Sequence, residues 1–456
     1  MMQESKQEVL DLIGIGLGPF NLGLAAMLTK VPTINALFFE QKPEFDWHPG
    51  LLIEGTTLQV PFFADLVTMA DPTSPYTFLN YLKEHNRLYH FYFLERFLIP
   101  RREYNHYCQW VSKQLDALRF SSEVVSVVHH ESKSPALFEV TVKDTQTQAI
   151  TTYWAKDVVI GVGSVPTIPI PHENLSNDHV FHSANFLQRF DELTTAESIT
   201  VIGSGQSAAE VFLTLLQAQP EHGYRIDWFT RSSGFFPMEY SKLGLEHFSP
   251  DYIDYFFQLP QAERDALFKR QGLLYKGISA STIATIYELL YERTVGEASP
   301  PVRLLAHTEV QNIVQTQEAG RITYELSCYH KEQKTAFTHD SDRIVMATGY
   351  QHKLPSFIAS LDPFIDWDAQ GRYQVDAVYQ VQSTKQTSNR IFVQNGELHT
   401  HGIGAPDLGL GAHRNAVIIN QLTGTEFYPV QKKNVFQQFG VSPAQVKQAE
   451  TEFVKG

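Results

Sequence analysis

Three apolar stretches of this chain end in glycines, and this pattern constrains the fold more than any other feature of the sequence. They span residues 9–18 (VLDLIGIGLG), 199–205 (ITVIGSG) and 344–349 (IVMATG). Each is typical of a buried parallel strand that runs into a tight turn, and helix-like sequence follows the first two. The chain therefore predicts an α/β fold with two nucleotide-binding units.

The first glycine stretch has the spacing of a dinucleotide-binding turn. It contains Gly14, Gly16, Gly18, Pro19, Phe20 and Asn21 (GIGLGPFN). Glycines let the backbone approach a pyrophosphate, whose charge is favoured by the helix N-terminus. The next strand ends in Glu40, about 20 residues further on, where an acid can accept a hydrogen bond from a ribose hydroxyl. Because an acid repels a 2′-phosphate, FAD or NAD is expected here rather than NADP; a plain glycine-rich turn is the alternative.

The second glycine stretch repeats this logic with different chemistry at the end of its second strand. It comprises VIGSGQSAAE at 201–210, with Gly203, Gly205, Gln206 and Ser207. Its second strand ends in TRSS at 230–233, so that Arg231 and Ser232 stand where an acid would bind a ribose. A guanidinium and hydroxyls can hold a 2′-phosphate, which favours NADPH, unless Arg231 is an ordinary surface cation.

The order of these stretches predicts two Rossmann-like dinucleotide-binding domains with a small helical substrate-binding insertion. We expect residues 1–190 and 340–456 to form a discontinuous FAD-binding domain, and residues 191–339 to form the NADPH-binding domain. Helical, aromatic sequence at about 240–296 interrupts the strand–helix alternation of the second domain. This segment is therefore expected to be the insertion.

Composition excludes several classes of protein. The formal net charge of −14 offers no basic face for a nucleic acid and suits a small cationic partner. Cys108 and Cys328 have neither metal-site nor CxxC spacing, so no metal, disulfide framework or dithiol reductase is expected. No apolar run is long enough to span a membrane, and the N-terminus lacks the basic region of a signal peptide. A cytoplasmic flavoprotein that takes hydride from NADPH fits these limits.

Several ordered segments resemble the microbial N-hydroxylating flavin monooxygenases, the lysine and ornithine N-monooxygenase family of siderophore biosynthesis. They are GIGLGPFNL at 14–22, FDWHPGL at 45–51, residues 58–82, VIGSGQSAAE at 201–210, ATGY at 347–350 and THGIGAPDLGLGAHR at 400–414. The resemblance implies that NADPH reduces FAD, that the flavin captures oxygen as a C4a-hydroperoxide, and that a neutral amine attacks it. It also implies a homo-oligomer, either a tetramer or a dimer.

The resemblance assigns further residues to the cofactors. Gln59 matches a glutamine beside the flavin and is the candidate catalytic residue; a structural hydrogen bond is its alternative role. Trp47 and His48 match a loop packed near the flavin ring, although both also suit core packing. The remaining cofactor-binding candidates are Thr348, Gly349, Tyr350, Asp407 and Leu408.

The sequence departs from the amino-acid-specific members at positions expected to select the substrate. Members that act on amino acids carry a lysine for the substrate carboxylate where this chain has Ala64, and an asparagine where it reads Gly277-Ile278-Ser279. An unpaired buried carboxylate is costly, so a diamine such as putrescine or cadaverine is expected. Substrate candidates are Ala64, Ile278 and Asp407; Asp407 would receive the far ammonium, or else is a helix-opening residue.

Other functions stay open at this point. Histamine, lysine or ornithine are alternative substrates for the same chemistry. A Baeyer–Villiger or S-oxygenating monooxygenase shares both glycine motifs, but GPFN and WHPG favour N-hydroxylation. A non-catalytic, NADPH-binding redox sensor is the alternative from a different class, because a fold alone does not fix function.

Overall fold

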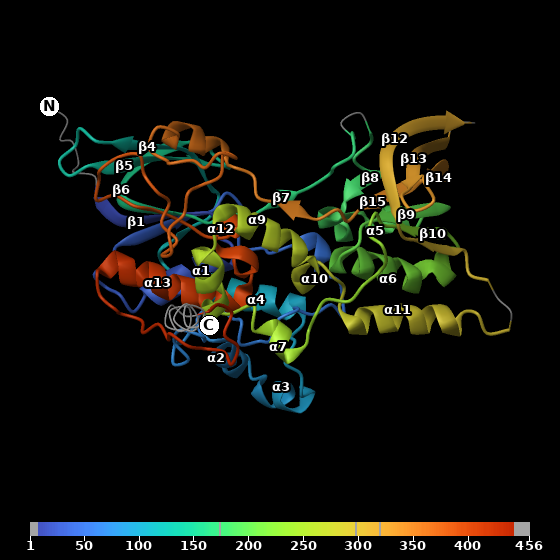
Figure 1. Ribbon diagram of the computed structural model, residues 1–456, viewed down its shortest axis with the longest axis horizontal. Helices are drawn as coiled ribbons and strands as arrows, with labels where there is room; N and C mark the ends of the chain where they lie inside the picture. The colour runs from blue at the N-terminus through green and yellow to red at the C-terminus, as the bar shows by residue number, and fades with distance from the viewer. Residues whose placement is uncertain (1–7, 173–174, 297–298, 319–320, 442–456) are drawn as a thin grey trace, which may run out of the picture.

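The computed structural model describes residues 8–172, 175–296, 299–318 and 321–441, arranged as two lobes (Figure 1). The first lobe is built on a seven-stranded sheet of order β3-β2-β1-β6-β5-β4, with β17 paired to β6. Its strands are β1 (Val9–Ile15), β2 (Ala36–Phe39), β3 (Leu118–Arg119), β4 (Ser122–His130), β5 (Leu137–Asp144), β6 (Ile150–Ile160) and β17 (Ile391–Val393). β17 brings the C-terminal part of the chain into this sheet, parallel to β6.

The register of the first sheet brings several strand ends together. Ile15 at the end of β1 pairs with Phe39 of β2 and with Ile160 of β6, all in parallel. The residues that follow these strands therefore meet at one edge of the sheet. In open parallel sheets, ligands bind at this carboxyl edge.

The second lobe contains a parallel sheet of order β11-β10-β9-β15-β8 and an antiparallel sheet of order β12-β13-β14. The strands are β8 (Val180–His182), β9 (Ser198–Ile202), β10 (Arg225–Phe229), β11 (Val302–Leu305), β12 (Thr308–Glu318), β13 (Arg321–His330), β14 (Thr335–Ser341) and β15 (Arg343–Met346). β8 and β15 lie outside the range 191–339 expected for this domain. Both boundaries shift because β15 pairs in parallel with β9 as well as with β8.

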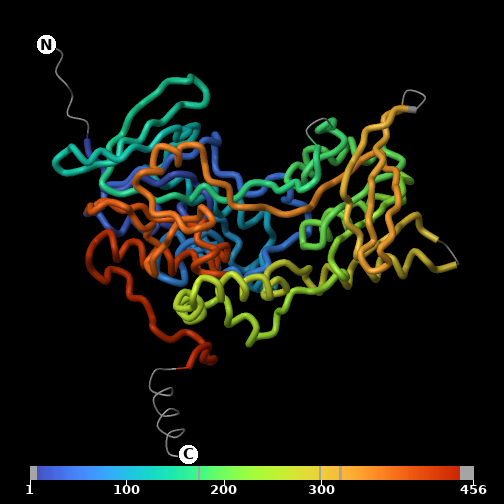
Figure 2. Tube along the Cα trace, turned by 45° about the horizontal axis from the view of Figure 1, so that its top comes forward, coloured from blue at the N-terminus to red at the C-terminus, as the bar shows by residue number. Residues whose placement is uncertain are grey.

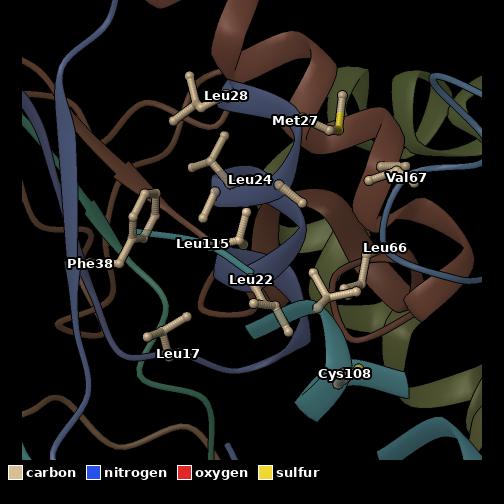
Figure 3. Packing of buried hydrophobic residues seen from close by; sticks show 14 of the residues in the cluster. Leu17, Leu22, Leu24, Met27, Leu28, Phe38, Leu66, Val67, Cys108 and Leu115 are labelled. Atoms are coloured by element: carbon tan, nitrogen blue, oxygen red, sulfur yellow. The ribbon is translucent and has the colours of Figure 1, made fainter. Parts of the chain in front are cut away.

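Helix α1 (Pro19–Leu28) is buried on all sides and forms the centre of the first lobe's core. Nine of its ten residues are buried. Phe38 of β2 lies on one side of α1, and Leu66 and Val67 lie on the other (Figure 3). α4 (Arg101–Ser112) and α13 (Gly411–Thr423) pack against α1. This packing fixes the helix that follows the first glycine turn.

The helical segment expected at about 240–296 divides between the lobes. Serines 241, 249 and 279 cap the first turns of α7 (Lys242–Leu245), α8 (Pro250–Gln258) and α11 (Ala280–Glu292). α8 and α9 (Gln261–Arg270) contact α12 (Leu398–His401) of the first lobe, while α11 contacts α6 (Gln206–His222) of the second. The remaining helices are α2 (Phe78–Glu84), α3 (Leu88–Leu94), α5 (Phe190–Leu193) and α10 (Gly272–Tyr275).

Two extended segments cross between the lobes side by side. β7 (Val165–Pro166) and β16 (Tyr350–Gln351) pair in antiparallel fashion, and the trace in Figure 2 runs through them from one lobe to the other. The architecture confirms the predicted α/β class with two nucleotide-binding lobes. Within the described ranges, no helix combines the length and apolar character needed to cross a bilayer.

Candidate active site

The glycines of the first turn serve different physical purposes. A Cβ on Gly14 would lie 2.0 Å from the Phe38 ring, so this glycine is required for strand packing. Gly16 has a φ of +84°, and a Cβ there would lie 2.7 Å from the carbonyl oxygen of Gly161. A Cβ on Gly18 would have no atom within 4 Å, because Gly18 faces open space. Only Gly18 leaves room in front of the helix for a ligand.

Asn21 holds the turn from behind rather than lining the cavity. Its side chain is fully buried, and its Nδ2 donates to the carbonyl oxygen of Gly16 at 2.8 Å. The Gln394 side-chain amide donates to Asn21 Oδ1 at 2.8 Å. Gln394 follows β17, so the C-terminal segment completes the first glycine turn. No local sequence signal marks this contact, which joins residues 373 positions apart.

A cavity of about 1030 Å³ opens at the carboxyl edge of the first sheet. Of the predicted cofactor residues it is lined by Gly16, Gly18, Pro19, Phe20, Glu40, Trp47, His48, Tyr350 and Leu408. Sequence reasoning missed other lining residues, including Lys42, Lys353, Gln394 and Asn395. Glu40 accepts hydrogen bonds from the backbone amides of Leu17 at 2.8 Å and Lys42 at 3.0 Å. The size, the open side of Gly18 and the acid at the second strand fit FAD.

Aromatic rings gather where the cavity meets the second lobe. His48 adopts left-handed backbone geometry with a φ of 51°, and its ring lies 5.3 Å from that of Tyr350. Burial, with the charges of Arg101 and Lys42, lowers the pKa of His48 to about 4, so its imidazole is neutral at pH 7. The Tyr350 ring also lies 5.1 Å from that of His182. The Tyr350 hydroxyl is buried without a hydrogen-bond partner among the described residues.

Ala64, Asp407 and Gln59 lie close together, although they come from distant parts of the sequence. A Cβ on Gly409 would lie 2.9 Å from Asp407 Oδ1 and 3.8 Å from the Ala64 Cβ. The Tyr240 hydroxyl donates to the Gln59 carbonyl at 3.0 Å. The pKa of Tyr240 is raised to about 12, mainly by burial and additionally by the nearby charge of Asp407. Burial raises the pKa of Asp407 to about 6. Hydrogen bonds from the backbone amides of Gly409 and Leu410 and the charge of Arg414 act in the opposite direction and limit this rise.

This cluster contains an orphaned donor and a residue that the sequence did not indicate. The Gln59 Nε2 is buried and has no hydrogen-bond partner within the described structure. Such a donor is costly unless a ligand or water accepts from it. Tyr240 stands at the start of the helical segment and reaches the first lobe, a contact between residues 181 positions apart. The catalytic role of Gln59 and the substrate roles of Ala64 and Asp407 stay predictions.

Ile278 lies away from this cluster. It is fully buried in the hydrophobic core of the second lobe, and its backbone pairs with Phe236 and Met238. Its side chain has no exposed surface with which to meet a ligand. A role for Ile278 in substrate selection therefore stays a prediction that the geometry does not support.

The second glycine turn leads into α6. Gly203 has a φ of +154°, and a Cβ there would lie 2.2 Å from the carbonyl oxygen of Ala347. Beside the turn, Ser207 and Ser232 are half-buried and Arg231 is exposed. The backbone carbonyl oxygen of Lys276 lies 3.5 Å from the Cβ position of Gly205, which places Lys276 beside this turn. Burial and the charge of Arg231 lower the pKa of the Lys276 side chain. The charges and the helix N-terminus fit a phosphorylated dinucleotide such as NADPH.

Two other predicted cofactor residues are engaged within the protein. Gln206 accepts from the Ser279 amide at 2.7 Å and donates to Glu210 at 2.9 Å, so its amide joins α6 to α11. The Thr348 hydroxyl donates to the Thr167 carbonyl. Gly349, with a φ of +86°, turns the chain between β15 and β16. Thr348 and Gly349 therefore shape the crossover beside the cavity, whereas Gln206 joins two helices of the second lobe.

Comparison with known proteins connects this geometry to a chemistry. The family model for L-lysine 6-monooxygenase/L-ornithine 5-monooxygenase matches residues 8–352. The chain is 42% identical to a putrescine N-hydroxylase of Shewanella oneidensis, over 96% of this chain and 85% of that protein.

Solved structures share the whole architecture. A cadaverine monooxygenase of the desferrioxamine biosynthetic pathway of Erwinia amylovora, bound to FAD, is 41% identical with a TM-score of 0.90, covering 95% of this chain and 99% of the other. An ornithine N-hydroxylase of Kutzneria, solved with reduced FAD, NADP⁺ and L-ornithine, is 27% identical with a TM-score of 0.84, covering 91% and 99%.

Proposed function

Because this chain belongs to the L-lysine 6-monooxygenase/L-ornithine 5-monooxygenase family, we propose that it N-hydroxylates an aliphatic diamine, putrescine or cadaverine. FAD and NADPH are its cofactors. The net reaction consumes one amine, O₂, NADPH and a proton, and yields a hydroxylamine, NADP⁺ and water. The product would enter hydroxamate-type siderophore biosynthesis, as the family resemblance implies.

The replacement of a cation by an acid beside Ala64 carries this proposal. Ala64 has only a methyl group, which cannot pair with a substrate carboxylate, and it is 5% exposed. Asp407, whose Oδ1 lies 2.9 Å from the Cβ position of Gly409, supplies a carboxylate instead. A substrate ammonium that pairs with this carboxylate compensates for the hydration that the carboxylate loses on burial. A substrate with an amine at each end is therefore favoured over an amino acid.

The cluster of Gln59, Ala64 and Asp407, next to the cavity-lining Pro406 and Leu408, would account for substrate selection. When bound and reduced by NADPH, FAD would activate O₂, one atom of which passes to the amine nitrogen while the other leaves as water. Asp407 holds the far ammonium of the diamine, and the neighbouring apolar surface lowers the pKa of the near amine, which must be neutral to react. The orphaned amide of Gln59 donates a hydrogen bond beside the flavin, and the neutral His48 adds no competing positive charge.

The deciding experiment measures hydroxylamine formation and oxygen uptake by FAD-loaded protein with NADPH. Putrescine, cadaverine, histamine, lysine and ornithine are the substrates. We expect product from the diamines, with product and oxygen near one to one. Product chiefly from lysine or ornithine would overturn the diamine assignment and require another anchor for the carboxylate. NADPH binding without product from any amine would point to a redox sensor.

The same proposal includes a homo-oligomer, which the surface of α3 supports. Tyr89, Tyr92 and Phe93 of this helix are 79%, 71% and 72% exposed, and Phe97 beyond it is 64% exposed. Their exposed area is on the order of 600 Å² if each ring offers about 200 Å². With the adjoining leucines it approaches the ~800 Å² that each partner buries in a standard interface. A second copy of the chain is the occupant that we assign to it.

A cytoplasmic location completes the proposal. Cys108 and Cys328 are both free and buried, and burial raises the pKa of each thiol, so neither is poised for redox chemistry. Unpaired cysteines suit a reducing compartment. Fractionation of cells that produce the protein should recover it with cytoplasmic marker enzymes, and recovery in a periplasmic or membrane fraction would contradict this location.

A further inference from the structure

A buried ion pair connects the two lobes beside the cavity. Arg101 opens α4 in the first lobe, and its two terminal nitrogens donate to the Glu210 carboxylate of α6 at 2.9 and 2.8 Å. The side chains are 12% and 3% exposed. A bidentate pair of this kind has a narrowly defined geometry, and removing one partner leaves the other charge uncompensated. The pair therefore constrains how α4 and α6 lie relative to each other.

The Glu210 end of the pair is tied to the second glycine turn. Gln206, in the first turn of α6, donates to Glu210 at 2.9 Å and to Thr282 at 3.1 Å. The side-chain oxygen of Gln206, Oε1, accepts from the Ser279 backbone amide at 2.7 Å. The network thus runs from α4 to the N-termini of both α6 and α11. The N-terminus of α6 is the position expected to hold the NADPH phosphates.

The Arg101 end is tied to the loop that lines the flavin cavity. Arg101 donates to the Leu51 carbonyl at 2.9 Å, three residues after His48. Leu51 and Ile53 are buried in the hydrophobic cluster of the second lobe. A Cβ on Gly50 would lie 1.9 Å from the Ala184 carbonyl oxygen, so the backbones of the two lobes touch here. In Figure 1, α4 lies between α1 and α6.

We propose that Arg101 and Glu210 form an interdomain latch, which positions the NADPH-binding end of α6 against the flavin-side loop for hydride transfer. Both are positioning residues, because they act through the Leu51 loop and through Gln206. This proposal depends on the binding of FAD and NADPH in the proposed function, but it does not depend on which amine is the substrate. Misplacing reacting groups by about 1 Å can cost on the order of a hundredfold in rate.

The test separates the latch from a general loss of stability. Glu210→Gln keeps the side-chain volume and removes the charge, and Arg101→Lys keeps the charge but loses the bidentate fork. Asp157→Asn is the matched control, because the Asp157 carboxylate, 6% exposed, is buried like that of Glu210 and pairs with Arg390 inside the first lobe alone. The limiting rate of flavin reduction by saturating NADPH is measured anaerobically. Hydrogen exchange of residues 48–53 and of the start of α6 is measured in the apoprotein.

The latch predicts a roughly 10- to 100-fold lower limiting reduction rate in both latch variants. It also predicts faster exchange at residues 48–53 and at α6 in these variants, with neither change in Asp157→Asn. The double variant Arg101→Glu with Glu210→Arg should recover part of the rate. Reduction rates within twofold of wild type in Arg101→Lys and Glu210→Gln would overturn the proposal. An equal loss of rate in Asp157→Asn would also overturn it, since stability alone would then explain the effect.

Discussion

At the scale of the residue, the charge beside Ala64 should decide which amines the enzyme accepts. In Ala64→Lys the new ammonium would pair with Asp407 and repel a second ammonium, because Asp407 Oδ1 and the Ala64 Cβ both lie within 4 Å of the Cβ position of Gly409. We expect kcat/KM for putrescine and cadaverine to fall at least about tenfold, since like-charge contacts cost several kcal/mol. Ala64→Met, of similar length but uncharged, is the control. An equal loss in Ala64→Met would mean that bulk, not charge, is responsible.

The titration of Asp407 gives a second prediction, measured in the pH profile of kcat/KM. The pKa of this carboxyl is about 6 in the free protein, so it is ionised above pH 6 and protonated below. Only the ionised form binds an ammonium, so activity should fall as pH drops through 6, up to about tenfold per unit. Protonation of the reacting amine, whose ordinary pKa is about 10.4, already lowers activity across this whole range, so the loss of the Asp407 charge appears as an additional slope below pH 6. Asp407→Asn should remove the extra slope below pH 6; a profile unchanged by the substitution would remove Asp407 from the site.

The exposed Arg231 should determine the choice between NADPH and NADH. Loss of a charge-assisted bond to the 2′-phosphate costs about 1.5–3 kcal/mol, so Arg231→Ala should raise the Kd for NADPH by roughly 10- to 100-fold. The Kd for NADH, which lacks that phosphate, should stay constant. Anaerobic flavin reduction across a series of cofactor concentrations gives both values. A parallel rise in both Kd values would show that Arg231 supports the turn rather than the phosphate.

Residues marked by a local motif could be predicted from the sequence, whereas residues that act across long separations could not. Gly16, Gly18 and Glu40 follow strands with recognisable spacing, and all three line the cavity. Tyr240 and Arg101 make their contacts with residues 181 and 109 positions away, so no local pattern marks them. Such contacts depend on how the lobes pack.

At the scale of the element, different glycines of the first strand–turn–helix unit are needed for packing and for ligand binding. Gly18 has a φ of −78°, which any residue adopts, and a Cβ there meets no atom, so Gly18→Ala should leave the apoprotein melting temperature unchanged. It should weaken FAD binding by roughly tenfold or more through the loss of a close backbone contact. Gly14→Ala, which clashes with Phe38, should instead destabilise the apoprotein by about 1–3 kcal/mol.

Calorimetry of the apoprotein and titration with FAD distinguish these two effects. A lower melting temperature in Gly18→Ala would place Gly18 in the packing of the lobe. Unchanged FAD affinity in a well-folded Gly18→Ala protein would show that the pyrophosphate does not approach this turn. Both outcomes would contradict the use of Gly18 as the open position of the site.

The sequence predicted where strands form better than it predicted the lobe to which each strand or helix belongs. The three glycine-terminated stretches become β1, β9 and β15, as their apolar runs indicate. The third was assigned to the first domain, yet β15 pairs with β9 and β8 in the second. The helical segment likewise divides between the lobes. Strand partners and docking faces are set by tertiary contacts, which local periodicity does not contain.

At the scale of the whole molecule, the first lobe is assembled from both ends of the chain. β17 pairs with β6, and Gln394 reaches Asn21 behind the first glycine turn. The C-terminal segment therefore completes the flavin cavity, which Gln394, Asn395 and Leu408 help to line. The discontinuous FAD domain was expected from the match at 400–414, but the hydrogen bond that fixes the turn was not.

The exposed aromatic face of α3 supports the last prediction, which concerns assembly. Wild-type protein should have an oligomeric mass by light scattering, because monomers seldom leave this much contiguous apolar surface in water. Tyr92→Glu with Phe93→Glu places two charges in the proposed contact, and should lower the mass towards that of the monomer while FAD binding is kept. Tyr287→Glu, at a 70% exposed ring on α11, is the matched control and should not change the mass. A monomeric wild type, or an unchanged mass in the α3 variant, would remove α3 from the interface.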